Sequence, residues 1–328
     1  MRILCLLSFL SMASAFVGHN SLPNRPAFAT TTTTSLFAIS AKDVKALRDL
    51  TGAGMMDCKK ALQENDGDAD AAAEFLRKKG LAKADKKASR VAAEGKIGTA
   101  ASDSKAVMVE INCETDFVAK DANFLTFVDQ VASVALDMDD STDMDALLAA
   151  DMGDKTVEDA RQAMVAKIGE NIQVRRMAML GGTDTTVGTY VHMNRIGVLV
   201  ELEGGTPALA ADVAMHIAAM NPPFATPDQV PADVLDKERN FLKEQALESG
   251  KPAEIVEKMV EGRIRKYLQE ICCVSQTYVK TNDETVEKYL ANNGAKLLGF
   301  TRVAVGEGIE KKQDNFAEEV AKMASGSS

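Results

Sequence analysis

The chain has 328 residues, of which 48 are acidic and 38 are basic, giving a net charge of −10 at pH 7. A chain of this length can bury a core and is expected to form two or three folded units. Because no strongly basic segment stands out, the composition argues against direct binding of nucleic acid and favours a protein partner.

Residues 1–38 have the composition of a targeting leader, with two arginines and no acidic residue. An apolar run ends at Ala13-Ser14-Ala15, small residues at the spacing that a signal peptidase recognises, and a serine- and threonine-rich segment follows. A signal segment followed by a transit segment resembles the leaders of proteins imported into complex plastids. We therefore predict the plastid (chloroplast) stroma, with the mitochondrial matrix as the alternative. The apolar run is too short to span a bilayer, so no membrane association is predicted for the mature form.

Residues 39–92 predict a bundle of three short helices. Ser40 and Asp43 have the spacing of a capping box, and glycines at 52 and 54 interrupt the helical pattern after the first helix. Asp68 can cap a third helix. The segment 77–90 is rich in lysine and alanine and predicts a solvated connecting helix.

The order strand, strand, helix occurs twice in the centre of the chain, which indicates an internal duplication and an α+β fold. The first copy is predicted at residues 96–99, 106–112 and 122–136, and the second at 188–192, 197–202 and 208–220. Val107, Val109 and Ile111 alternate with the residues between them, which predicts a strand with one buried face. The link between the copies, residues 137–171, is acidic and then helical.

Residues 226–274 predict an antiparallel helical hairpin, with helices at 232–248 and 253–271. We expect the seam between these helices to be lined by Phe241, Ala246, Ile255, Met259 and Ile264. The sequence leaves open whether the hairpin projects from the protein or folds onto its core. A last strand is predicted at 299–305, and a short helical module at 308–328 carries Phe316 and Val320 on one side of its helix.

The stretch Thr115-Asp116-Phe117-Val118 lies where a predicted strand is followed by a helix, so that a carboxylate and an aromatic ring are adjacent. Such a junction is a rigid place from which to present side chains to another molecule. The alternative is that Phe117 packs in the core and Asp116 caps the following helix. Without a further indication, that alternative is favoured.

Two longer strings supply the further indication. Residues 47–62 (LRDLTGAGMMDCKKAL) and 110–120 (EINCETDFVAK) resemble the two signature strings of the translation elongation factor Ts family, in the same order. The resemblance continues through 167–171, 258–262 and 305–309 and covers nearly all of the chain after residue 39.

The resemblance implies a domain plan. A helical domain similar to the ubiquitin-associated (UBA) fold is implied at 39–92, with core subdomains at 93–176 and at 177–225 together with 275–307. An inserted coiled coil is implied at 226–274, and a C-terminal module at 308–328.

The resemblance also implies a guanine-nucleotide exchange factor that binds elongation factor Tu in its GDP-bound and nucleotide-free forms. Phe117 would insert between partner side chains and displace the elements that hold Mg²⁺, and Asp116 would add negative charge near that site. Thr115 and Val118 would position the pair. Such an activity makes no bond and requires no cofactor or metal of its own, so the protein would not be an enzyme in that sense.

Five further residues match positions that contact the GTPase domain of the partner in this family: Arg48, Met55, Met56, Phe316 and Val320. Adjacent residues cannot share one helix face, so one of the two methionines is expected to pack inside the bundle and the other to be exposed. The coiled coil would contact the partner or a second copy of the chain, so a homodimer through the hairpin is one alternative.

Other classes of function are less favoured. An enzyme with Cys113 as nucleophile would need a base beside the thiol, and no histidine lies within 70 residues of it in the sequence. An adaptor that binds ubiquitin-like partners through residues 39–92 is the second alternative. The five cysteines contain no Cys-x-x-Cys pair and predict no disulfide framework. His192 is more readily interpreted as a structural histidine than as a partner contact.

Overall fold

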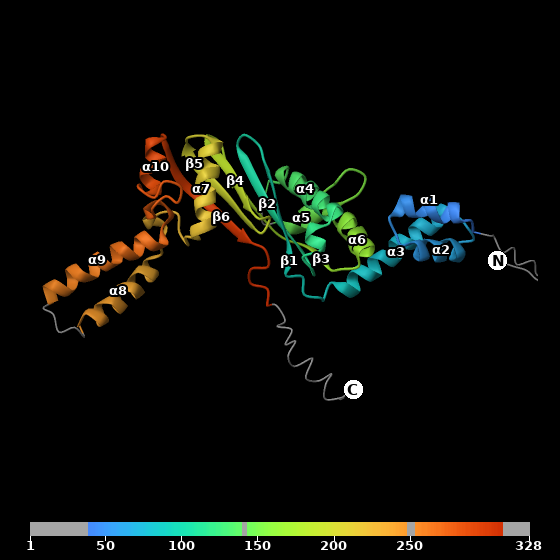
Figure 1. Cartoon of the computed structure of the whole chain (residues 1–328), viewed down its shortest axis with the longest axis horizontal. Helices are drawn as coiled ribbons and strands as arrows, with labels where there is room; N and C mark the ends of the chain where they lie inside the picture. The colour runs from blue at the N-terminus through green and yellow to red at the C-terminus, as the bar shows by residue number, and fades with distance from the viewer. Residues whose placement is uncertain (1–38, 140–142, 248–252, 311–328) are drawn as a thin grey trace, which may run out of the picture. The chain divides into compact units, whose positions relative to one another are not determined.

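A computed structural model describes residues 39–139, 143–247 and 253–310. The predicted leader and the predicted helix with Phe316 and Val320 lie outside the described residues. The described part is a mixed α+β protein, as predicted, with helices and two antiparallel sheets (Figure 1). Within the described residues, no helix combines the length and the apolar character needed to cross a bilayer.

The three helices of the N-terminal bundle are α1 (Ala41–Thr51), α2 (Met55–Glu64) and α3 (Ala69–Lys87). The predicted capping box is confirmed, because the Ser40 hydroxyl accepts from the Asp43 N–H and the Asp43 carboxylate accepts from the Ser40 N–H. Asp68 accepts from two N–H groups at the start of α3, as predicted. The lysine-rich segment is not a separate helix: α3 continues through it, and Ala84 on this part of α3 is buried against the core.

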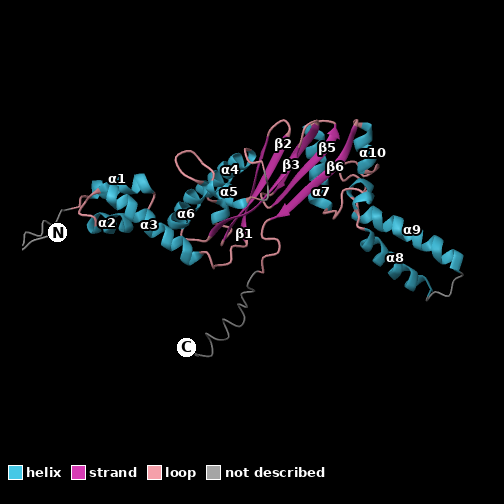
Figure 2. Cartoon of the chain, turned by 180° about the vertical axis from the view of Figure 1, so that it is seen from behind, coloured by secondary structure: helices cyan, strands magenta, loops and turns pink. Residues whose placement is uncertain are grey.

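The described residues form two three-stranded antiparallel sheets, in each of which the strands follow their order in the chain. The first contains β1 (Glu94–Ala101), β2 (Lys105–Cys113) and β3 (Ile172–Gly181) in that order, and the second contains β4 (Thr185–His192), β5 (Ile196–Gly204) and β6 (Ala295–Ala304). The helices beside the first sheet are α4 (Ala122–Leu136), α5 (Met144–Ala149) and α6 (Val157–Ile168), and those beside the second are α7 (Pro207–Met220) and α10 (Val286–Asn292) (Figure 2).

The strand β2 is buried on both faces, so the prediction of a single buried face is wrong. Val107, Val109 and Ile111 pack toward α4, as the alternation indicates. The opposite face carries Met108, which packs with residues of the second sheet in a shared apolar cluster. The two sheets therefore pack face to face, and the apolar side chains on this face of β2 are covered by the second sheet rather than by water.

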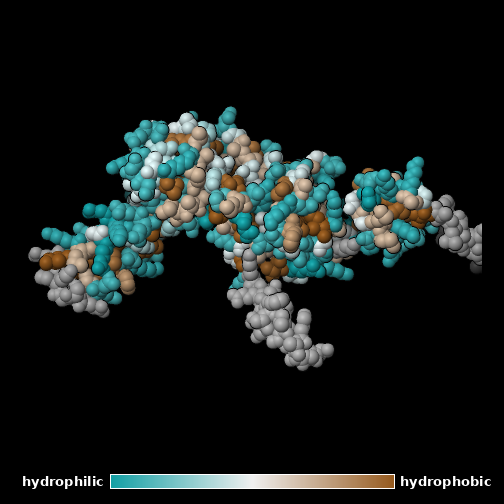
Figure 3. Space-filling view, in the orientation of Figure 1, coloured by the Kyte–Doolittle hydropathy of each residue, from teal (hydrophilic) through white to brown (hydrophobic). Residues whose placement is uncertain are grey.

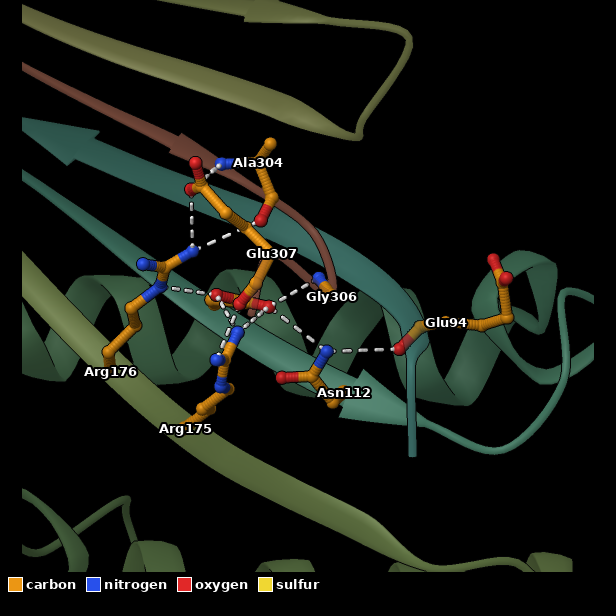
Figure 4. A network of polar contacts seen from close by, with 8 residues as sticks. Glu94, Asn112, Arg175, Arg176, Ala304, Gly306 and Glu307 are labelled. Atoms are coloured by element: carbon orange, nitrogen blue, oxygen red, sulfur yellow. Dashed lines mark hydrogen bonds and ion pairs between the residues drawn. The ribbon is translucent and has the colours of Figure 1, made fainter. Parts of the chain in front are cut away.

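The opposite face of β2 also carries Glu110, a fully buried carboxylate. Its oxygens accept hydrogen bonds from the Arg175 guanidinium at 3.1 and 3.2 Å, from Arg176 Nε, from Asn112 Nδ2 at 3.0 Å and from the Gly306 N–H at 2.8 Å (Figure 4). Buried charges are tolerated when they are paired and hydrogen-bonded in this way. The network joins the first sheet to the turn that follows β6.

A β-bulge explains how two consecutive arginines reach the same carboxylate. Glu110 pairs with Arg176, whereas its neighbour Ile111 pairs with Val174, so that Arg175 is an extra residue in β3. Successive residues of a regular strand point to opposite faces, and a bulge removes that restriction locally.

The helical hairpin consists of α8 (Ala232–Leu247) and α9 (Ala253–Ile271), close to the predicted bounds. Its apolar seam is formed by Leu242, Ala246, Val256, Val260 and Ile264, with Leu268 partly buried beside them. Two of the predicted seam residues, Phe241 and Ile255, are exposed instead. The buried residues on each helix recur at intervals of four. Leu242 and Val256, each one position later in the chain, therefore occupy the seam in place of Phe241 and Ile255.

Candidate functional site

The loop that follows β2 presents Phe117 to the solvent. β2 ends at Cys113, a 3₁₀ turn spans Val118–Lys120, and α4 begins at Ala122. The side chain of Phe117 is 81% exposed, so the alternative that places it in the core is wrong. The ring of Phe117 is therefore accessible to another molecule.

Asp116, beside it, is an exposed carboxylate paired with Lys120 one helical turn later. The Lys120 Nζ donates to Asp116 Oδ2 at 2.7 Å. This hydrogen bond and the lysine charge lower the pKa of Asp116, so the carboxylate is ionised at neutral pH. Asp116 does not cap the following helix: Asp121 does so, accepting from the N–H groups of Asn123 and Phe124.

The residues on each side of this pair are held in place. Val118 is buried in the apolar core beside α4. Thr115 donates from its N–H to Glu170 Oε2 at 3.0 Å and from its hydroxyl to Glu170 Oε1 at 2.7 Å. The structure thus brings together the four predicted residues of the loop, with the outer two fixed and the inner two exposed.

A second loop, residues 169–171 between α6 and β3, lies against the first. The Asn171 N–H donates to Glu114 Oε1 at 2.6 Å. Each loop therefore donates to a glutamate of the other, since Thr115 of the first loop donates to Glu170 of the second. No role is predicted for Glu170 or Asn171 from the sequence alone. Both belong to the string 167–171 that carries the family resemblance, and that string was the signal that could have found them.

Cys113 is buried at the end of β2, where it is part of the apolar core beneath the loop. Its thiol donates to the Thr115 carbonyl oxygen at 3.1 Å. Burial, together with the charges of Glu170 and Glu94, raises the pKa of this thiol to about 12. The thiol is therefore neutral at pH 7, and a neutral thiol is a poor nucleophile, which argues against an enzyme that uses Cys113.

We expect Cys113 to resist alkylation in the folded protein. Incubation with iodoacetamide at pH 8, followed by mass spectrometry of the peptide that contains Cys113, should show modification only after unfolding in urea. The buried Cys58 provides an internal comparison in the N-terminal bundle. Rapid modification of Cys113 in the folded protein would contradict the assigned burial and the raised pKa.

The other predicted contact residues lie on the N-terminal bundle. Met55 and Met56 are 57% and 74% exposed, so the expectation that one of them packs inside is wrong. Both lie in the first turn of α2, outside the cluster of buried residues that forms the core of the bundle. Hydrophobic surface is visible on this bundle in Figure 3. Arg48 on α1 is exposed as well and lies 3.5 Å from Asp49.

His192 is exposed at the end of β4, where its Nδ1 lies 3.1 Å from the Tyr190 hydroxyl. This hydrogen bond fits the interpretation of a structural histidine. Among the described residues, no group of histidine, cysteine, aspartate and glutamate side chains has the arrangement of a metal site.

The site defines a protein that presents a supported, exposed loop from an α+β core, and comparison with known sequences gives its class, a translation elongation factor. The family model described as Elongation factor TS matches residues 114–307. Elongation factor Ts of Thioalkalivibrio sulfidiphilus is 57% identical over 291 residues, covering 88% of this chain and 99% of the relative. That of Alkalilimnicola ehrlichii is 55% identical, covering 88% of this chain and all of the relative. The chain belongs to the elongation factor Ts family, which confirms the resemblance described above.

Proposed function

We propose that this protein is a guanine-nucleotide exchange factor for elongation factor Tu and binds that partner in its GDP-bound and nucleotide-free forms. The observation that carries the proposal is the exposure of Phe117 on a loop that is fixed on both sides, in a member of the elongation factor Ts family. The protein makes and breaks no bond in this activity.

The proposed mechanism follows from the thermodynamics of linked binding. A GTPase holds GDP through phosphate contacts and a bridging Mg²⁺. A second protein can release that GDP only if it binds the empty GTPase more tightly than the loaded one. Phe117 inserts between side chains of the partner that support the Mg²⁺ site, and the ionised Asp116 places negative charge nearby. Loss of Mg²⁺ then weakens the phosphate contacts.

The remaining surfaces supply affinity rather than displacement. We propose that Arg48, Met55 and Met56 dock on the GTPase domain, since exposed methionines make adaptable apolar contacts. Phe316 and Val320 are proposed to do the same from the C-terminal module. The α8–α9 hairpin is proposed to contact the partner or a second copy of the chain, and a homodimer is the consequence in the second case.

The composition of residues 1–38 supports a plastid as the compartment. The apolar run, the small residues that end it and the acid-free segment after it are the reasons for this part of the proposal. A fusion of residues 1–38 to a fluorescent protein, expressed in an alga with complex plastids, tests it directly. Fluorescence in mitochondria would overturn the compartment and leave the exchange activity unaffected.

The test of function is the release of a fluorescent GDP analogue from purified elongation factor Tu, followed with and without substoichiometric amounts of this protein. We expect the release to accelerate and each molecule to act repeatedly. Elongation factors Tu of plastid and mitochondrial origin are compared in parallel. Absence of acceleration with both would overturn the proposal and would favour an adaptor, which binding of the same chain to ubiquitin-like proteins would then test.

A further inference from the structure

Phe117 needs support from outside its own side chain, because four-fifths of that side chain is exposed and little of it packs. The backbone must therefore fix the direction in which the ring points. The nearest fixed points are Val118, which is buried, and Thr115, which is bound by Glu170. Val118 holds one end of the loop by apolar packing, and the Lys120 N–H donates to the Phe117 carbonyl within the turn at 3.2 Å. At the other end, the side chain of Glu170 ties Thr115 to a second loop.

Glu170 uses both of its carboxylate oxygens on this one residue. Oε2 accepts from the Thr115 N–H and Oε1 accepts from the Thr115 hydroxyl, at 3.0 and 2.7 Å. The same hydroxyl oxygen accepts a hydrogen bond from the Val118 N–H, with a nitrogen–oxygen distance of 3.4 Å. Thr115 thus links Glu170 to the residue that follows Phe117. Hydrogen bonds to an ionised acceptor are shorter and stronger than neutral ones, and a two-point contact also fixes orientation.

The loop that carries Glu170 is itself braced. Asn171 donates from its side-chain amide to the Arg90 carbonyl at 2.7 Å and to the Ala88 carbonyl at 3.3 Å. The Lys87 ammonium donates to the Gly169 carbonyl. Gly169, with a φ of 90°, closes α6 in a conformation that L-residues rarely adopt and directs the chain into this loop. Glu170 is therefore presented from a segment tied to the end of α3.

We propose that Glu170 is a positioning residue of the exchange reaction, which sets the orientation of Phe117 through its two hydrogen bonds to Thr115. The inference rests on the proposed exchange function and deepens it. Glu170 touches neither the nucleotide nor the partner in this account, and it acts only by restricting the loop. A group held within about 0.5 Å of its productive position contributes fully, and a displacement of about 1 Å can cost on the order of 100-fold in rate.

The test measures the rate of GDP release from elongation factor Tu at increasing concentrations of this protein. It gives the maximal rate of release and, separately, the concentration of this protein at which half of that rate is reached. For Glu170→Ala in the full chain, we expect the maximal rate to fall on the order of tenfold. The half-saturating concentration should remain within about twofold, because the proposed docking surfaces on the bundle and hairpin are unchanged. A partly unfolded protein would instead behave as a lower concentration of normal exchange factor, with its loss visible by circular dichroism.

Glu170→Gln provides the conservative comparison. The glutamine carbonyl can accept from the Thr115 N–H, and its NH₂ group can donate to the Thr115 hydroxyl, which is also an acceptor. We expect this variant to recover most of the maximal rate. Thr115→Val should lower the rate in the wild-type chain and add little in the Glu170→Ala chain, because the two residues act through the same bonds. Glu203→Ala, which removes an exposed carboxylate at the end of β5, is the matched control.

The outcomes distinguish this inference from the function on which it rests. An active wild-type chain with an unchanged maximal rate in Glu170→Ala would overturn the positioning role alone. Equal loss in Glu170→Gln and Glu170→Ala would also overturn it, since the hydrogen bonds would not be the cause. A wild-type chain that accelerates no release would overturn the exchange function, and the positioning role with it. Amide hydrogen exchange at Thr115 supplies a readout besides activity and should be faster in Glu170→Ala than in the wild type.

Discussion

Replacing Phe117 with alanine is expected to slow the release of GDP from elongation factor Tu by roughly 30-fold, which corresponds to about 2 kcal/mol of lost transition-state stabilisation. The reason is that truncation of a large aromatic side chain at the centre of a contact typically has an effect of this size. The ring is also accessible to a partner, since Phe117 is 81% exposed. The measurement is the rate of release of a fluorescent GDP analogue at saturating concentrations of the variant.

The same exposure separates function from folding. Because Phe117 packs little against its own chain, we expect the free energy of unfolding of Phe117→Ala to remain within about 0.5 kcal/mol of the wild type. Phe117→Leu keeps an apolar side chain, so its rate of GDP release should lie between those of the wild type and Phe117→Ala. Met220→Ala removes another exposed apolar side chain, at the end of α7, and serves as the control. Full exchange activity in Phe117→Ala would contradict the insertion mechanism.

Replacing Glu110 with alanine is expected to lower the free energy of unfolding by about 3–5 kcal/mol. Removal of this carboxylate leaves two arginine side chains and the Gly306 N–H without the acceptor around which they are arranged. Urea denaturation at pH 7, followed by circular dichroism, measures the loss. Glu307→Ala is the matched control, since Glu307 bonds Arg176 from an exposed position. We expect it to cost less than about 1 kcal/mol, as exposed ion pairs generally do.

The charge of Glu110 also gives the stability a defined dependence on pH. Burial acts to raise the pKa of this carboxyl, but the bonds from Gly306, Arg176 and Asn112 outweigh it and hold the pKa below its ordinary value of 4.5. A carboxyl whose pKa is lower in the folded than in the unfolded state stabilises the fold fully at pH values above its pKa in the unfolded state. That contribution to stability is lost as the pH falls through the pKa of the folded state.

Glu110→Gln tests this dependence, because its side chain cannot ionise. The difference in stability between the wild type and Glu110→Gln should be constant near neutral pH and should shrink as the pH falls below about 4.5. Denaturation series at several pH values measure it. A difference that stays the same down to pH 3 would show that the charge of Glu110 does not stabilise the folded protein.

The elements with strong local signals were predictable from the sequence. The bounds of α4 agree with the prediction at both ends, since its apolar periodicity is uninterrupted and Asp121 can cap its start. β3 was missed because Arg175 and Arg176 interrupt the alternation that identifies a strand. These arginines are tolerated there only because a buried carboxylate on β2 pairs with them. That partner is a long-range contact, which periodicity within one segment cannot reveal.

The same distinction applies to the candidate site. The sequence string identified Thr115, Asp116, Phe117 and Val118, and the exposure of the middle two agrees with the interpretation of the string as a presenting loop. The string 167–171 marks Glu170, but the hydrogen bonds from Thr115 to Glu170 could not be predicted, because the two residues are 55 positions apart and meet only in the folded chain. The error at Met55 and Met56 has a local cause: both lie in the first turn of α2, directly after its N-cap Gly54, where the bundle leaves both methionines uncovered.

The order of the strands along the chain has a consequence for synthesis on the ribosome. β5 receives its neighbour β6 only after α8, α9 and α10 have been made, and Glu110 receives the Gly306 N–H from a residue 196 positions later. A nascent chain that ends before residue 295 therefore carries β5 as an open strand edge, and such edges can pair with other chains. We expect chains stalled at this stage to aggregate more than chains completed through β6, in which β5 is paired on both sides.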